Sequence, residues 1–185
     1  MNEVEAVKDR ATIERIEYRL AEIGQVYADI WRVGLNLALR ISDLVALKYE
    51  DVAGDELSVI EGKTGKRRRV PINSTARAVI ERRRKEYPDH VYLFQSDSNR
   101  SKALVKPVSR EMVARVFKQV GEGKSIGVRL GTHSMRKTRG YMMHSAGKPI
   151  ELICRVLNHS SPAVTMRYIG ITQQDIGQTY TDFEL

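Results

Sequence analysis

The sequence predicts a mainly α-helical (α+β) domain with one small antiparallel sheet. Apolar residues recur at helical spacing through most of the chain. Residues 57–72 depart from this spacing, with short apolar runs on either side of a glycine-containing turn. The 185 residues fit a single domain with a substantial hydrophobic core.

The first elements follow from apolar spacing. Residues 11–21 and 25–39 predict two helices, and Ser42 is expected to cap a short helix that reaches Leu47. Residues 57–72 predict a β-hairpin with a very basic tip and return strand. Further helices are expected over 75–86, 110–120, 133–145, 149–157, 162–168 and 173–181.

End signals support these helices. Asn73 or Ser74, Ser109, Thr132 and Ser161 are expected N-caps. Gly147 is expected just after the end of a helix. A third short strand is expected over Tyr92–Phe94, which gives about eight helices and one small sheet in all.

Positive charge is concentrated in the middle of the chain. The whole sequence carries 31 Lys and Arg against 23 Asp and Glu, a net charge of +8. Residues 61–150 alone hold 22 basic and 7 acidic side chains, whereas the chain on both sides is mildly acidic. This localised excess predicts a surface for a polyanion; the alternative is a solvated basic face without a partner.

Several protein classes are excluded by the sequence. No apolar run approaches the roughly 18 residues that span a bilayer, and the charged N-terminus does not resemble a secretory signal. Cys154 is the single cysteine, so no internal disulfide forms and a reducing compartment is expected. The four histidines lack metal-ligand spacing, and neither a serine-hydrolase elbow nor a Walker-type phosphate loop is present. We therefore expect no metal and no cofactor.

Thr132-His133-Ser134-Met135-Arg136 places an imidazole and a guanidinium on one face at the start of a predicted helix. Free N–H groups and the helix dipole favour an anion there. A guanidinium beside an imidazole suits a phosphate. Taken alone, the pair also fits an N-terminal histidine and a surface arginine without a function.

Four short motifs lie in order between residues 38 and 168. They are Ala38-Leu39-Arg40-Ile41-Ser42-Asp43-Leu44, Gly62-Lys63-Thr64-Gly65-Lys66, Thr132-His133-Ser134-Met135-Arg136, and Leu157-Asn158-His159 followed nine residues later by Tyr168. Together they resemble the motifs of the tyrosine recombinases, also called the phage integrase family. The resemblance covers nearly the whole chain and implies the helical catalytic domain of that family.

The resemblance implies a site-specific recombinase or integrase that cleaves and rejoins DNA without metal or ATP. Tyr168 is implied as the nucleophile, which forms a 3′-phosphotyrosyl link and frees a 5′ hydroxyl. A phenol with a pKa of about 10 is a weak nucleophile, so the charge that develops on the phosphate must be neutralised. The residues implied for these tasks are Arg40, Arg136 and His159 on the phosphate, His133 on the tyrosine proton, and Asp43 in support of Arg40 or His133.

Lys63 is implied as the general acid for the leaving 5′ oxygen, with Lys66 left open as an alternative. Further DNA contacts are expected from basic residues that follow the motifs. These are Lys66, Arg67, Arg68, Arg69, Lys137 and Arg139.

Residues 1–185 are expected to form one catalytic domain. About 35 residues precede the first arginine motif, too few for the family's N-terminal core-binding domain. This is expected of an excised catalytic domain or of the short recombinases that invert fimbrial promoters, and it predicts weak, salt-dependent DNA binding. Residues 170–185 form an apolar tail that is expected to dock on its own domain or on a neighbouring protomer.

The implied partners are double-stranded DNA, further copies of the chain in a tetramer on two DNA sites, and accessory DNA-bending proteins, with no membrane. The implied location is the bacterial cytoplasm, with nucleoid association on DNA. Two alternatives stay open: DNA relaxation of the type IB topoisomerase kind, and a DNA-binding regulator without catalysis. The six matching catalytic positions favour the recombinase, because a regulator has no use for Tyr168.

Overall fold

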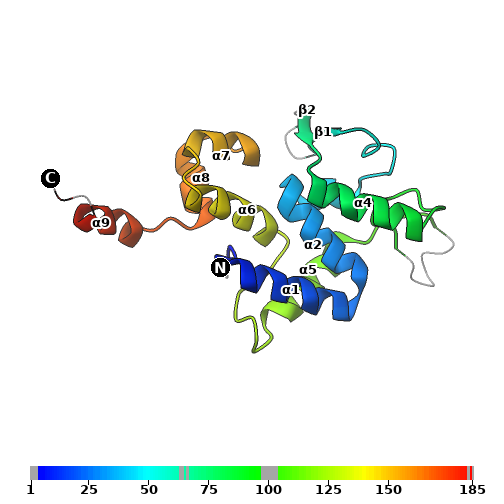
Figure 1. Cartoon of the computed structure of the whole chain (residues 1–185), viewed down its shortest axis with the longest axis horizontal. Helices are drawn as coiled ribbons and strands as arrows, with labels where there is room; N and C mark the ends of the chain where they lie inside the picture. Colours follow the sequence, from blue (N-terminus) through cyan, green and yellow to red (C-terminus); the bar gives the residue numbers. More distant parts are fainter. Residues whose placement is uncertain (1–3, 63–64, 66, 97–103, 183, 185) are drawn as a thin grey trace.

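The computed structural model describes residues 4–62, 65, 67–96, 104–182 and 184. This part of the chain is mostly helical, with one two-stranded antiparallel sheet, as predicted (Figure 1). The elements are α1 (Arg10–Ile23), α2 (Gln25–Leu37), α3 (Ile41–Val45), β1 (Glu56–Ile60), β2 (Arg67–Pro71), α4 (Ser74–Glu86), α5 (Arg110–Gly121), α6 (Ser134–Ser145), α7 (Ile150–Leu157), α8 (Pro162–Ile169) and α9 (Gln173–Asp182).

Helix α2 lies at the centre of the main core, the larger of two hydrophobic cores, where α1, α4 and α6 pack against it. Trp31 of α2 is fully buried and meets Phe117 of α5 edge-on, with ring centroids 5.6 Å apart. A Cβ atom at Gly34 would overlap Sδ of Met135, so glycine leaves room for this buried side chain of α6 against α2. The helix that carries Arg136 is therefore fixed against the main core.

The C-terminal helices form a second, smaller core on α6. Ile153 and Leu157 of α7 and Ile169 of α8 are fully buried there, together with Ala38. A Cβ atom at Gly140 of α6 would lie 2.6 Å from Cγ2 of Ile169, which shows how closely α8 approaches α6. Helices α7 and α8 thereby bring the last of the four motifs next to the third.

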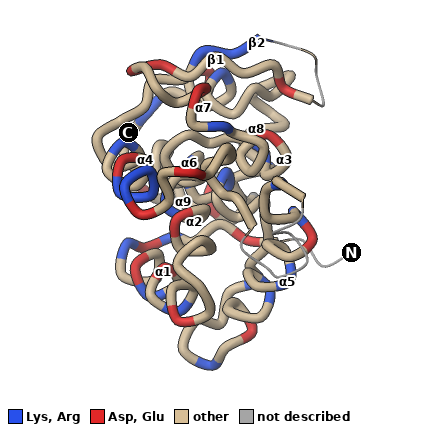
Figure 2. Tube along the Cα trace, turned by 90° about the vertical axis from the view of Figure 1, so that its right-hand side faces the viewer, with Lys and Arg blue, Asp and Glu red and all other residues tan. Residues whose placement is uncertain are grey.

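Strands β1 and β2 form the predicted hairpin. Leu57 pairs with Val70, and both side chains are buried against the main core. Figure 2 shows the basic residues of β2 at one end of the molecule. The predicted third strand, Tyr92–Phe94, is wrong for this part of the chain: its first residue forms only an isolated bridge with Lys48, and the other two are buried in the core.

Two predicted caps are also wrong. The N-cap of α6 is His133, one residue later than predicted, because Gly131 and Ser134 close a tight turn in which the Ser134 hydroxyl accepts the Gly131 N–H at 3.1 Å. The N-cap of α3 is Arg40, which leaves Ser42 inside the helix.

Helix α9 lies beyond α8 and stands apart from the two cores (Figure 1). Its Tyr180 is exposed. The side chains of Ile176 and Phe183 lie outside the described part, so docking of the tail stays a prediction. None of the described helices is both long and apolar enough to cross a membrane.

Candidate active site

Tyr168 of α8 lies at the meeting point of the predicted catalytic residues. Its hydroxyl oxygen is 3.1 Å from Nδ1 of His133. Its ring meets the ring of His159 edge-on, with centroids 4.6 Å apart. The positive charges of Arg136 and Arg40 both act on its phenol. Five of the six residues that the motifs predict are thus brought together.

The phenol is not ionised in advance. Burial raises the pKa of Tyr168 above its ordinary value of about 10, even though Arg136 and Arg40 pull it down. The hydroxyl therefore carries its proton at neutral pH and needs an acceptor when it attacks. Nδ1 of His133 lies within hydrogen-bond distance for that transfer.

Arg136 is held by backbone carbonyl groups from two other segments. Its Nη1 donates to the carbonyl of Ala38 and its Nη2 to the carbonyl of Leu157. The residue is 2% exposed. These two bonds fix the guanidinium relative to the turn before α3 and the end of α7, so its direction is set without DNA.

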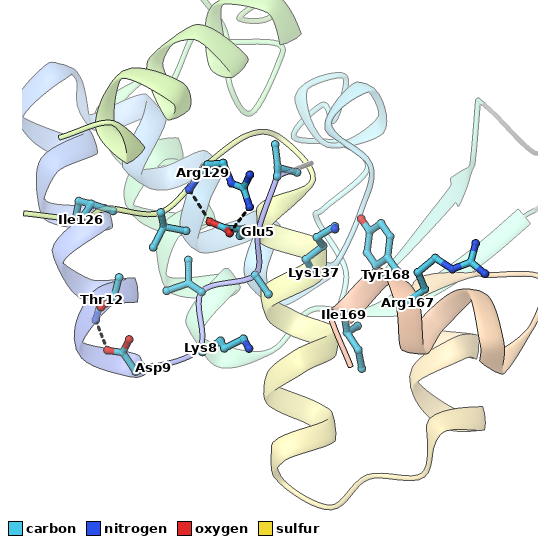
Figure 3. Close-up of a pocket in the computed structure, with 15 residues that line it drawn as sticks. Glu5, Lys8, Asp9, Thr12, Ile126, Arg129, Lys137, Arg167, Tyr168 and Ile169 are labelled. Atoms are coloured by element: carbon cyan, nitrogen blue, oxygen red, sulfur yellow. Dashed lines mark hydrogen bonds and ion pairs between the residues drawn. The ribbon is translucent and has the colours of Figure 1, made fainter. Parts of the chain in front are cut away.

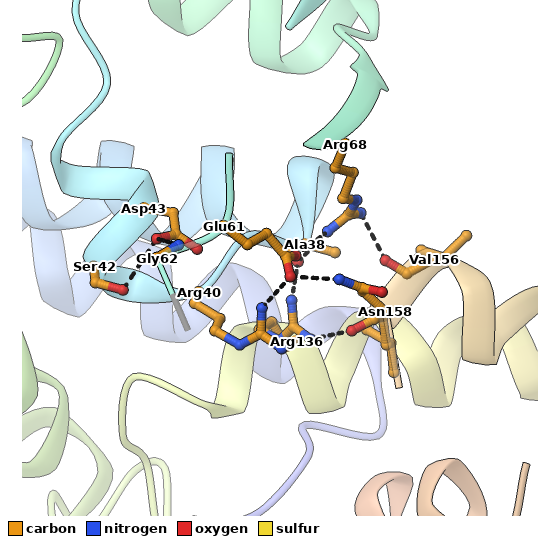
Figure 4. A network of polar contacts seen from close by, with 11 residues as sticks. Ala38, Arg40, Ser42, Asp43, Glu61, Gly62, Arg68, Arg136, Val156 and Asn158 are labelled. Atoms are coloured by element: carbon orange, nitrogen blue, oxygen red, sulfur yellow. Dashed lines mark hydrogen bonds and ion pairs between the residues drawn. The ribbon is translucent and has the colours of Figure 1, made fainter. Parts of the chain in front are cut away.

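Arg40 is held by a carboxylate instead. Its Nη1 forms an ion pair with Glu61, which is fully buried at the base of the hairpin (Figure 4). Asp43 does not support Arg40 or His133 by a hydrogen bond among the described residues. Its Oδ1 accepts the backbone N–H of Gly62 at 3.3 Å. We therefore assign Asp43 to the hairpin base, where it holds the backbone of Gly62.

His159 is neutral in the free protein. Burial, followed by the charges of Arg136 and Arg40, lowers its pKa to about 4. Its Nδ1 lies 3.1 Å from Oγ1 of Thr165, whose own hydroxyl hydrogen is donated to the carbonyl of Ser161. Nδ1 is thus the N–H donor, and Nε2 is unprotonated until the imidazole gains a second proton.

A cavity of about 570 Å³ lies beside Tyr168 (Figure 3). The N-terminal segment, residues 4–9, forms one wall and residues 167–170 form the other. Lys137 lies between these walls, with Nζ 5.2 Å from the centroid of the Tyr168 ring. The backbone N–H of Val7 donates to Oγ1 of Thr138 at 2.8 Å, which ties the N-terminal segment to α6.

The basic residues predicted to bind DNA differ in their surroundings. Arg67 and Arg69 are exposed on β2. Arg68 points inward, and its Nη2 donates to the carbonyl of Val156 at 2.6 Å. Lys137 is 6% exposed and Arg139 is half-buried. Lys63 and Lys66 lie outside the described residues, so the choice between them stays open.

Two polar residues that support the site were not predicted from the sequence: Glu61 holds Arg40, and Thr165 holds His159. Arg68 was predicted to contact DNA, but its guanidinium bonds inward to the carbonyl of Val156. One signal for Arg68 exists, because residues two apart on a strand share a face and Val70 is a clear core residue. A lone glutamate in a basic hairpin carries no comparable signal.

The chain is similar in sequence to one known protein family and to several of its members. Residues 10–175 match the model of the Phage integrase family. The chain is 33% identical to the probable integrase/recombinase YoeC of Bacillus subtilis over 99% of this chain and 98% of that protein. It is 31% identical to the tyrosine recombinase XerA of Pyrococcus horikoshii, over 75% of this chain and 48% of that protein.

Solved structures show the same fold. A crystal structure of the XerA recombinase aligns over 98% of this chain and 65% of its own, with a TM-score of 0.69 at 20% identity. A lambda integrase structure with bound DNA aligns over all of this chain and 65% of its own, with a TM-score of 0.70 at 16% identity. The chain thus spans nearly all of YoeC but about two thirds or less of these longer proteins. The family match, the YoeC relative and the site geometry lead to one conclusion: the chain belongs to the phage integrase family of tyrosine site-specific recombinases.

Proposed function

We propose that the chain cuts and rejoins double-stranded DNA through a 3′-phosphotyrosyl link at Tyr168, without metal or ATP. The observation that carries this proposal is the 3.1 Å contact between the Tyr168 hydroxyl and Nδ1 of His133, beside the charges of Arg40 and Arg136. A protein that only binds DNA needs no nucleophile with a proton acceptor and two guanidinium groups around it.

The cleavage step is a transesterification. The hydroxyl oxygen of Tyr168 attacks phosphorus, and its proton passes to Nδ1 of His133. The bond from phosphorus to the 5′ oxygen breaks, and the leaving oxygen takes a proton from Lys63, the role that the family resemblance implies. One phosphodiester replaces another, so a 5′ hydroxyl can reverse the step without ATP.

The phosphate is stabilised by preorganised donors. Arg40 and Arg136 are fixed from behind by Glu61 and by two carbonyl groups, which leaves other N–H groups for the non-bridging oxygens. His159 adds a donor at Nε2 once it is protonated. In this proposal Arg67 and Arg69 of β2, with Lys66 and Arg139, bind neighbouring phosphates and set the affinity.

Complete recombination requires cooperation between copies of the chain. We place four copies on two DNA sites, with residues 170–185 of each docked on a neighbour, because α9 stands apart from both cores of its own chain. Accessory proteins that bend DNA would assist the assembly. Because the proposed substrate is double-stranded DNA, we expect the reaction to occur in the compartment that holds the chromosome.

A covalent capture experiment tests the proposal. The probe is a library of nicked duplexes with random sequence around the nick, incubated with the full chain in EDTA and separated on a denaturing gel. We expect a protein–DNA adduct whose sequenced DNA identifies the target site, and no adduct with Tyr168→Phe. An adduct that persists in Tyr168→Phe, or one that forms only after Mg²⁺ is added, would contradict the proposal.

The DNA site recovered in this way then allows strand exchange to be distinguished from relaxation of supercoiled DNA. A plasmid with two copies of the site is expected to yield recombinant products. Relaxation of the supercoiled plasmid with no recombinants would point to topoisomerase activity instead.

A further inference from the structure

Glu61 is a fully buried carboxylate among positive charges. It directly follows β1 and is 0% exposed. Its Oε2 accepts from Nη1 of Arg40 and from Nδ2 of Asn158, and its Oε1 lies 3.5 Å from Nη1 of Arg68 (Figure 4). A carboxylate is buried at this depth only when charged partners and hydrogen bonds replace its water.

The guanidinium groups around Glu61 repel one another. Burial first, and then the charge of Arg136, lowers the pKa of Arg68. Burial first, and then the charge of Arg40, also lowers the pKa of Arg136. Arg136 is held by neutral carbonyl groups, so Glu61 is the carboxylate that offsets this repulsion among the described contacts.

Glu61 lies behind Arg40 instead of in the place of the DNA phosphate. The carboxylate is inaccessible to solvent, whereas the Arg40 side chain is 17% exposed. One nitrogen of Arg40 bonds inward to Glu61, and a planar guanidinium has further N–H groups that remain for a phosphate. The contact therefore orients Arg40 without blocking it.

Asn158 connects the same carboxylate to the second histidine motif. Asn158 ends α7 in the left-handed conformation, with φ of 49°, which glycine and asparagine adopt most readily. Its side chain donates to Glu61, and the next residue is His159. The turn that presents His159 is thus bonded to the residue that holds Arg40.

The neighbouring residue of Glu61 is fixed as well. The backbone N–H of Gly62 donates to Oδ1 of Asp43 at 3.3 Å. Two consecutive residues of the hairpin base are therefore bonded to the segment that carries Arg40. Lys63 follows them directly in the sequence.

We propose that Glu61 is a positioning residue for DNA cleavage: through its contacts with Arg40 and Asn158 it aligns the phosphate-binding arginine with the His159 turn before DNA binds. This inference rests on the proposed function of Arg40 and His159. It predicts a loss in the rate of the chemical step with little change in DNA affinity, because Glu61 is inaccessible to DNA.

The test compares variants by single-turnover cleavage of the nicked duplex at saturating protein, with affinity measured by fluorescence anisotropy. Glu61→Gln keeps the shape and removes the charge, and we expect cleavage to slow by roughly 10–100-fold, as when hydrogen-bond partners that orient metal ligands are changed. The dissociation constant should change by less than about threefold. Glu56→Gln is the matched control, since Glu56 lies on β1 in an exposed pair with Arg69, and it should cleave at the wild-type rate.

A double-mutant cycle separates positioning from a general effect on the fold. If Glu61 acts through Arg40, Glu61→Gln should cause almost no further loss in an Arg40→Ala protein. Fully additive losses would overturn the proposal, as would wild-type cleavage by Glu61→Gln. A loss confined to affinity would overturn it too.

Asn158→Gly keeps the proposal testable if Glu61→Gln does not fold. Glycine keeps the left-handed turn and removes only the amide that reaches Glu61. We expect a several-fold slower cleavage at saturating protein, and an unchanged rate would contradict the proposal. If the wild-type protein itself forms no adduct with DNA, the proposed function is refuted. Failure of the Glu61 inference can thus be distinguished from failure of the proposed function.

Discussion

His133 and Tyr168 meet at 3.1 Å although they lie 35 residues apart in the sequence. His133 precedes α6, which is packed into the main core, and Tyr168 belongs to α8, which is packed into the smaller one. The two cores share α6, with Gly34 of α2 against one side of it and Ile169 of α8 close to its Gly140. The side chains of Tyr168 and His133 are therefore aligned by the junction of the two cores.

The arginines of the site and those of the hairpin should fail in different ways. Arg40→Ala and Arg136→Ala should slow cleavage by on the order of 10²–10³ with a smaller effect on binding, because they stabilise charge that develops in the transition state. Arg67→Ala and Arg69→Ala should weaken binding to all sequences and lower the salt slope of log K by about 1 each. Single-turnover cleavage rates measure the effect on chemistry, and binding titrations at several salt concentrations measure the effect on DNA affinity. Indistinguishable profiles would contradict the division into chemistry and affinity.

The general acid can be identified with a substrate whose leaving group needs no proton. A 5′-bridging phosphorothiolate releases a thiol with a pKa of about 8.5, which leaves without protonation. Lys63→Ala should therefore cleave ordinary DNA slowly and the phosphorothiolate at nearly the wild-type rate. Lys66→Ala should show no such rescue. Rescue of Lys66→Ala in place of Lys63→Ala would assign the acid to Lys66.

DNA binding should be accompanied by proton uptake at His159. Its pKa is lowered to about 4 in the free protein, and a phosphate beside the imidazole favours the charged form and raises that pKa. At about pH 6.5 the complex should therefore hold more protons than its separate parts, and affinity should fall as pH rises. Calorimetry in buffers of different ionisation enthalpy measures the uptake. Equal uptake by a His159→Gln protein would assign the proton to another group.

Removal of the C-terminal tail should abolish strand exchange between two DNA sites without abolishing DNA cleavage. Deletion of residues 173–185 should leave both cores folded, because α9 stands apart from them. Adduct formation should persist or rise, since it needs one site, whereas recombination of two sites should be lost because it needs coordinated copies. A truncated protein that recombines as well as the full chain would show that the tail is passive.

Much of the fold was predictable because local signals agree with the tertiary structure. Asn73, Ser109 and Ser161 cap α4, α5 and α8 through their side chains, as their positions before apolar periodic segments predict. Tyr92–Phe94 misled because a short run of buried β-forming residues gives the same sequence pattern whether or not it pairs as a strand.

The central residues of the site were predictable from motifs, whereas their supports were not. Arg40, His133, Arg136, His159 and Tyr168 have residue types that the chemistry requires at fixed spacing. Glu61 acts through contacts with residues 21 and 97 positions away, and such pairing leaves no periodic trace in one sequence. Asp43 was predicted to support Arg40 or His133, whereas its backbone partner in the structure is Gly62.

The most direct test of the account is the identity of the residue that carries DNA in the trapped adduct. The adduct would be digested with nuclease and protease and sequenced by tandem mass spectrometry. We expect a nucleotide phosphate on the oxygen of Tyr168 in essentially all modified peptides. Modification of Tyr180, of Tyr141 or of any residue other than Tyr168 would contradict it.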